Sequence, residues 1–177
     1  MNAAFLISLA LCFLVSGCVS FNGATPETPT QRARVLDQFA GTYANESSPS
    51  RRRLSDALFL HYIVSEPQPS HVALCRTPSG FEAVAFHGSR AGHRRVLTEG
   101  TSFTFSGERL NFGSESSRYD NQFYLTNIKS RSTTRREASL SPTGDLVFSY
   151  STTTSGTNWG IPMFNASRQQ YVFKRIR

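Results

Sequence analysis

The chain has 177 residues, of which 38% are apolar and 12% aromatic, and its formal net charge is +7. This length and apolar content suffice for one ordinary domain with a real core. The aromatic content, with Gly, Ser and Thr at short intervals, favours strands over helices. A basic surface indicates nucleic acid, anionic lipid or acidic polysaccharide as partners.

The chain opens on an apolar run over residues 3–15, and no Lys or Arg precedes Arg32. A membrane-spanning helix needs about 20 apolar residues, so the run is too short to cross a bilayer. It fits the hydrophobic region of a secretory signal, and the small residues Ser16 and Gly17 follow it. We therefore expect export.

The four residues Val15-Ser16-Gly17-Cys18 resemble a bacterial lipobox: a branched apolar residue, a small residue, Gly or Ala, then Cys. The resemblance implies that the Cys18 thiol receives diacylglycerol, that the Gly17–Cys18 bond is cleaved, and that a fatty acid such as palmitate acylates the new amine. The Lys or Arg that usually precedes the apolar run in this family is absent. Ordinary signal cleavage and an uncleaved anchor are the alternatives.

Two or three acyl chains hold a protein durably on a membrane, whereas one chain holds it only reversibly. The other two cysteines are Cys12, inside the signal, and Cys75. Removal of residues 1–17 takes away Cys12, and the lipid occupies the Cys18 thiol, so Cys75 has no cysteine left to form an intramolecular disulfide.

Residues 18–29 contain Thr, Pro, Gly and Asn with little apolar content, which is typical of a solvated tether. Val19 follows the modified cysteine. In lipoproteins of Gram-negative bacteria an Asp at this position favours the inner membrane, so the resemblance implies the outer membrane. Residues 30–177 are then the folded domain.

The domain is predicted to begin with a short helix over Gln31–Phe39, capped by Thr30 and stopped by Gly41. The stretch Phe39-Ala40-Gly41-Thr42-Tyr43 resembles the opening of lipocalin-like barrels, where a short helix leads into a strand carrying Gly-x-Trp. A helix stop followed by an ordinary strand is the alternative.

Short β-like runs separated by turn residues follow, with apolar residues alternating at period two. The predicted strands are Ala57–Val64, His71–Arg76, Phe81–His87, Arg94–Leu97, Ser102–Phe105, Arg109–Phe112, Gln122–Ile128, Glu137–Leu140, Asp145–Tyr150 and Gln170–Ile176. Tight turns are expected at 77–80 and 141–144. The pattern predicts an all-β domain: a small antiparallel up-and-down barrel, lipocalin-like, or a related sandwich.

The longest stretch without a strand pattern is Ser151–Ser167. Its apolar residues include Trp159 and Phe164, which we expect to form a lid over an open end of the barrel. The last strand is expected to close the sheet against the first.

A search for catalytic groups identifies no catalytic, cofactor or metal site. His87 and His93 with Glu82 or Glu99 match no metal-ligand spacing. His71 is four residues from Cys75 on one strand, about 13 Å away at about 3.3 Å per residue, so it cannot activate the thiol. We expect a buried or half-buried thiol.

Basic clusters occur at residues 51–53, 94–95 and 135–136. They lack the aromatic platform that single-stranded nucleic acid requires, so we expect no nucleic-acid partner. Solvated loops are the ordinary explanation of such clusters, and anionic lipid headgroups or envelope proteins are the functional one.

The leading hypothesis is a lipid-anchored, non-enzymatic envelope protein with a structural or interaction role. The alternative is a lipocalin-like carrier of an apolar small molecule, which requires a dry cavity of roughly 300 Å³ or more. An envelope hydrolase would require Cys75 and a histidine in one pocket.

Overall fold

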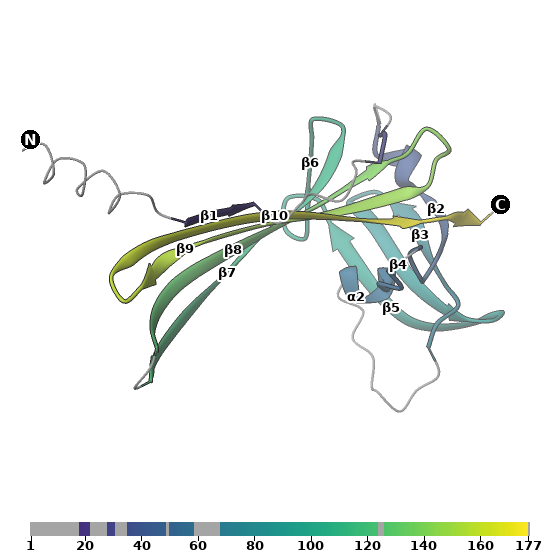
Figure 1. Cartoon of the computed structure of the whole chain (residues 1–177). Helices are drawn as coiled ribbons and strands as arrows, with labels where there is room; N and C mark the ends of the chain where they lie inside the picture. The colour runs from purple at the N-terminus through teal and green to yellow at the C-terminus, as the bar shows by residue number, and fades with distance from the viewer. Residues whose placement is uncertain are drawn as a thin grey trace, which may run out of the picture. The chain divides into compact units, whose positions relative to one another are not determined.

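The computed structural model describes residues 18–21, 28–30, 35–48, 50–58, 68–123 and 126–176, and it is nearly all β (Figure 1). The predicted all-β class is confirmed. The strands are β1 (Cys18–Phe21), β2 (Gly41–Ala44), β3 (His71–Thr77), β4 (Gly80–His87), β5 (Arg90–Thr98), β6 (Thr104–Ser106), β7 (Arg109–Phe123), β8 (Thr126–Leu140), β9 (Leu146–Asn158), β10 (Ile161–Phe173) and β11 (Arg175–Ile176).

The strands form two sheets. One has the order β11-β2-β3-β4-β5, and the other has the order β1-β10-β9-β8-β7-β6. The chain passes between the sheets at Lys174, because β11 leaves β10 and pairs with β2. The described strands form no closed barrel, and a sandwich-like arrangement fits their pairing. The expectation that the C-terminal strand meets the first strand of the domain holds for Arg175–Ile176 only.

The chain divides into two compact units. The first, here called the hairpin unit, contains the described residues 18–21, 115–123, 126–134 and 151–167. The second, the core unit, contains 28–30, 35–48, 50–58, 68–114, 135–150 and 168–176.

The core unit is held together by aromatic side chains. Ring centroids follow one another at 5.7, 6.0, 5.2, 5.5 and 5.6 Å along a chain of six residues. Those residues are Phe81, Phe103, Phe112, Phe148, Tyr150 and Tyr171. Phe81 lies in the five-stranded sheet, whereas most of the others lie on strands of the six-stranded sheet. Both sheets therefore share one core.

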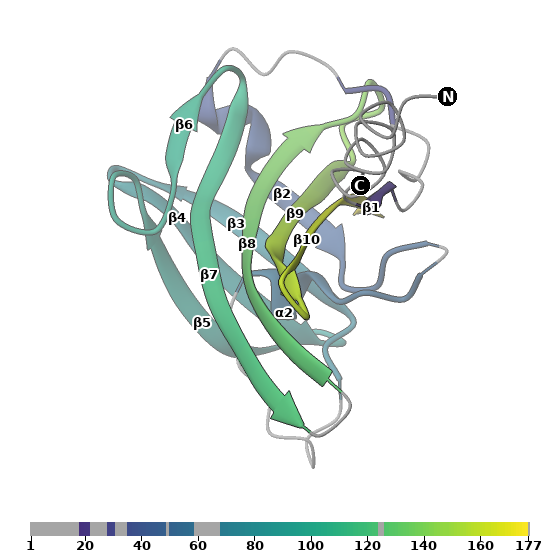
Figure 2. The ribbon, with the colours of Figure 1, turned by 60° about the vertical axis from the view of Figure 1, so that its left-hand side comes forward.

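Two tight turns that the sequence predicts are found in the structure, and the first joins β3 to β4 in the five-stranded sheet (Figure 2). Thr77 pairs with Gly80 across the β3–β4 turn, which places Cys75 opposite Glu82 as expected from that turn. The turn at 141–144 is also confirmed, because the Gly144 N–H donates to the Ser141 carbonyl at 2.9 Å.

Tyr43 of β2 is fully buried. Its hydroxyl donates to the Phe39 carbonyl at 2.9 Å, and the guanidinium carbon of Arg175 lies 5.7 Å from its ring centroid. Burial raises the pKa of the Tyr43 phenol above its ordinary value of 10.0, and the nearby Arg175 charge opposes this only in part.

The helical elements differ from the prediction. Helix η1 (Leu36–Phe39) is a single 3-10 turn, and residues 31–34 lie outside the described residues. A second helix, α2 (Leu54–Ala57), was not expected. Ala57 was predicted to begin the strand Ala57–Val64 but ends this helix, and residues 59–64 lie outside the described residues. Asn45 stabilises this helix, because its side-chain oxygen accepts from the Ser55 N–H at 2.9 Å.

Two predictions along the six-stranded sheet are wrong. The strand expected at Gln122–Ile128 spans a hairpin instead, since β7 ends at Phe123 and β8 begins at Thr126. The stretch Ser151–Ser167, expected to be irregular, belongs to β9, β10 and the two-residue turn between them. Strands that lack a wholly apolar face carry no period-two signal, so these lengths could not be read from the sequence.

Candidate functional site

Side chains along β8 and β9 divide between two faces of the hairpin unit. The Thr154 hydroxyl donates to the Ser132 hydroxyl at 3.1 Å, so these two side chains share one face. Side chains alternate along a strand, and neighbouring residues point to the opposite face. Arg131 and Ser155 lie on that opposite face, and Lys129, two residues before Arg131, lies there as well.

Strand β7 adds to the same surface. Arg131 Nε donates to Ser116 Oγ at 3.0 Å, which puts Ser116 on the face of Arg131. By alternation, Arg118 and Asp120 of β7 follow it. We call Arg118, Asp120, Lys129, Arg131 and Ser155 the cationic face.

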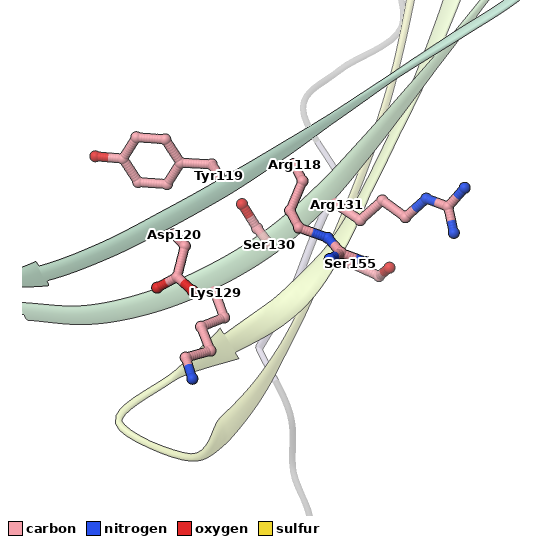
Figure 3. Close-up of a pocket in the computed structure, with 7 residues that line it drawn as sticks. All are labelled: Arg118, Tyr119, Asp120, Lys129, Ser130, Arg131 and Ser155. Atoms are coloured by element: carbon pink, nitrogen blue, oxygen red, sulfur yellow. The ribbon is translucent and has the colours of Figure 1, made fainter.

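A shallow cavity of about 310 Å³ lies in this part of the hairpin unit (Figure 3). Figure 3 shows Asp120 and Lys129 on one side of their strands and Tyr119 and Ser130 on the other. The residues that line the cavity are Arg118, Tyr119, Asp120, Lys129, Ser130, Arg131 and Ser155.

Gly156 lets β9 approach β8 beside this cavity. A Cβ atom at Gly156 would collide with the Lys129 carbonyl oxygen and with the backbone of Ser130. Because the colliding atoms belong to the backbone, no side-chain rotation could make room. The absence of a side chain at Gly156 therefore helps to place Lys129.

The cationic face carries three positive side chains and one carboxylate, and all four are exposed. Guanidinium and ammonium groups donate several hydrogen bonds to phosphate or carboxylate oxygens. Exposed charges are screened by salt over about 10 Å at 0.1 M ionic strength. This surface suits an anionic group held by contacts that salt weakens.

The β9–β10 turn of the hairpin unit exposes apolar side chains. Trp159 and Ile161 are each 59% exposed, and Phe164 further along β10 is 41% exposed. Trp159 and Gly160 both have positive φ, 52° and 78°, as a two-residue type I′ turn requires. A bulky residue in the left-handed region costs about 1–2 kcal/mol, so Trp159 is not placed there for stability.

The predicted lid residues thus lie on a β-hairpin and not on an irregular segment. Trp159 is at its turn and Phe164 is on β10. Both belong to the hairpin unit, whereas the buried aromatic chain belongs to the core unit.

Cys18, the predicted lipidation site, is the first residue of β1. This strand runs parallel to β10, with Cys18 in register with Met163 and Phe21 with Ala166 (Figure 1). Residues 18–21 of the expected tether are therefore a sheet strand, while 22–27 and the cleavage-site residue Gly17 lie outside the described residues. No helix in the described part of the chain is both long and apolar enough to span a bilayer.

Cys75 is exposed, so the expectation of a buried or half-buried thiol is wrong. Cys75 lies opposite Glu82, a half-buried residue whose carboxylate forms an ion pair with Arg94 at 3.3 Å. His71 stacks on Phe86 at 4.9 Å between ring centroids and lies four residues from Cys75 along β3.

His87 ends β4, and His93 lies within β5. Within the described ranges, no group of three or more His, Cys, Asp and Glu side chains could hold a metal ion. Glu99 forms an isolated bridge with Phe103, beyond the end of β5.

The basic clusters found by sequence are only partly in loops. Residues 94–95 lie on β5 and 135–136 on β8. In the remaining cluster, the Arg52 guanidinium lies over two rings, 5.7 Å from the Tyr150 centroid and 6.0 Å from the Tyr171 centroid. Burial raises the pKa of Tyr150, and the charge of Arg52 opposes this.

Sequence reasoning missed the cationic face because its members are separated along the chain. Arg118 and Lys129 are on different strands, and neither belongs to a run of basic residues. A signal was present in the spacing of Lys129 and Arg131, which are two residues apart and so share a face of any strand.

Comparison of the chain with protein-family models, with curated proteins and with solved structures finds no match in any of the three.

Proposed function

We propose that this chain is a lipid-anchored envelope protein with a non-enzymatic structural or interaction role. The observation that carries the proposal is the motif Val15-Ser16-Gly17-Cys18 at the end of an apolar run. Cleavage after Gly17 leaves Cys18 as the first residue, with diacylglycerol on its sulfur and an acyl chain on its amine. Val19 favours the outer membrane, with the protein facing the periplasm.

The position of β1 supports this proposal. The mature chain would begin at Cys18, where β1 begins, so the anchor would be attached at the edge of a sheet. Two or three acyl chains on Cys18 would attach the protein durably to the membrane. The hairpin unit would then lie close to the membrane surface.

The surroundings of Cys75 in the described part of the chain do not suit a cysteine nucleophile. In the described residues, the exposed thiol of Cys75 faces a carboxylate across the strand pair, and His71 is too far along β3 to act as its base. A cysteine nucleophile needs a base within hydrogen-bond reach.

The buried aromatic chain counts against a lipocalin-like carrier. The ring centroids of Phe112 and Phe148 are 5.2 Å apart, and those of Phe148 and Tyr150 are 5.5 Å apart. These rings lie in the core, where a carrier would hold its ligand. Aromatic rings at these distances fill the interior and leave no space for a ligand between them. The cavity of about 310 Å³ is lined mainly by charged and hydroxyl side chains, which do not suit an apolar ligand.

Metabolic labelling with an alkyne analogue of palmitate tests the proposal. The full chain and its Cys75→Ala variant should take up label and partition with membranes, because both keep Cys18. The Cys18→Ala variant should lose the label. Label retained by Cys18→Ala, or absent from the unsubstituted chain, would refute acylation at Cys18.

A further inference from the structure

We propose that the hairpin unit docks onto bilayers containing anionic phospholipid: Trp159 and Ile161 enter the interface, and Arg118, Lys129 and Arg131 bind headgroup phosphates. This inference rests on the proposed function, because the acyl chains on Cys18 decide which end of the hairpin unit meets the bilayer. It assigns a binding surface to residues that the anchor itself does not use.

The direction of β1 determines which end of the unit meets the membrane. Cys18 pairs with Met163 and Phe21 with Ala166, so β1 runs away from the β9–β10 turn and begins nearest to it. Trp159 precedes Met163 by four residues, or about 13 Å at about 3.3 Å per residue. Acyl chains on Cys18 would therefore enter the bilayer beside the turn that carries Trp159.

The chemistry of the turn suits the bilayer interface. Trp159 and Ile161 are each 59% exposed, and Tyr119 of β7 is 54% exposed. Indole and phenol rings prefer the headgroup region, where an apolar body and a polar group are both satisfied. Trp159 lies in the turn between β9 and β10, with a φ of 52° that is unfavourable for a bulky side chain.

The cationic face lies within reach of the same interface. Ser155, which lines the cavity, precedes Trp159 by four residues on β9, again about 13 Å. Three exposed cations against one carboxylate attract the anionic surface of a membrane. Phosphate oxygens accept from guanidinium and ammonium groups alike. The apolar turn would thus enter the bilayer interface, while the cations bind the headgroup phosphates of the same bilayer.

Trp159 provides the test, because it is the single tryptophan of the chain. The acylated protein is reconstituted into phosphatidylcholine vesicles with or without phosphatidylglycerol, both carrying a brominated lipid that quenches indole fluorescence on contact. The anchor holds the protein on both kinds of vesicle. We expect a blue shift and strong quenching of Trp159 in anionic vesicles, and reversal in about 1 M salt, where the screening length falls to about 3 Å.

A matched pair of triple variants locates the contact. Arg118→Ser/Lys129→Ser/Arg131→Ser should weaken the response, by about fivefold in partition for each cation removed. Arg51→Ser/Arg90→Ser/Lys174→Ser removes the same charge from exposed positions of the core unit and should leave the response unchanged. Equal losses in both variants would show attraction by net charge only and overturn the proposed site.

A further experiment tests docking by the hairpin unit independently of acylation at Cys18. The Cys18→Ala chain is mixed with excess anionic vesicles, and we expect weaker, salt-sensitive quenching of Trp159. Quenching without acylation in the labelling experiment would overturn the anchor and leave the docking surface standing. Acylation with Trp159 unquenched and open to iodide would overturn docking and leave the anchor, with the turn facing water or a protein.

Discussion

Cys18 lies in parallel register with Met163 of β10, so the residue predicted to carry the lipid is also the first residue of a sheet strand. An anchor on a free tether would let the domain turn in any direction above the membrane. An anchor attached at β1 restricts the hairpin unit to orientations in which the start of β1 approaches the bilayer.

Disruption of β1 should expose β10 without affecting acylation. In the variant Ser20→Pro/Phe21→Pro, one of the two prolines must remove an N–H that faces β10, because alternate residues of a strand point their N–H groups to the partner. We expect amides within 163–166 to exchange with deuterium about tenfold faster, as the loss of about one hydrogen bond implies. Thr30→Pro, which lies outside every strand, is the control. Unchanged exchange in the double variant would show that β1 contributes nothing to this edge.

Trp159→Asn should separate stability from membrane docking. Asn tolerates the left-handed region that Trp159 occupies, so we expect the free energy of unfolding to rise by up to about 1 kcal/mol. Removal of the indole should at the same time weaken vesicle binding of the Cys18→Ala chain, measured by flotation. A variant that is less stable and binds vesicles as before would contradict both parts.

Phe148→Ala should be severely destabilising. Phe148 is fully buried and contacts the rings of Phe112 and Tyr150. Removal of a buried aromatic ring costs about 3–5 kcal/mol in free energy of unfolding, read from urea denaturation. Ile161→Ala removes an exposed side chain and should change that free energy by no more than about 0.5 kcal/mol. A loss below about 1 kcal/mol for Phe148→Ala would mean that the rings do not form the core.

Stability should fall above pH 10, and Tyr43 should account for part of the fall. Burial raises the pKa of Tyr43 in the folded state, so below pH 10.0 the phenol is neutral in both states and contributes no pH dependence. As pH rises above 10.0 the unfolded chain loses its proton first, and the free energy of unfolding decreases until the folded phenol also ionises.

Tyr43→Phe should make this alkaline decrease shallower, in urea denaturation followed from pH 8 to pH 11. At neutral pH the variant should lose about 1–2 kcal/mol, because the Phe39 carbonyl loses its donor. Tyr119→Phe, at an exposed phenol, should leave the alkaline decrease as it is. An identical pH profile for Tyr43→Phe and the unsubstituted chain would contradict the assignment.

The sequence predicts the β class and the tight hairpins because turn residues act locally. Gly144, with φ of 85°, occupies a backbone region that glycine enters freely, and apolar residues recur at every second position of β9 in Leu146, Phe148 and Tyr150. The same local logic places Cys75 opposite Glu82.

The parts of β7, β8, β9 and β10 that belong to the hairpin unit could not be predicted from turn residues and apolar alternation. In β8, Lys129 and Arg131 alternate with Ser130 and Ser132, so both faces are polar and no apolar period marks the strand. The cationic face depends on register between strands that are distant in sequence, which single-chain patterns do not specify.

Acylation at Cys18 can be read from the mass of the first tryptic peptide of the mature protein. Trypsin would release residues 18–32 from a chain that begins at Cys18, since Arg32 is the first cleavable residue after the signal. We expect this peptide to carry diacylglycerol on the Cys18 sulfur and an acyl group on its amine. A peptide beginning at Cys18 without acyl chains, or an N-terminus elsewhere, would contradict this expectation.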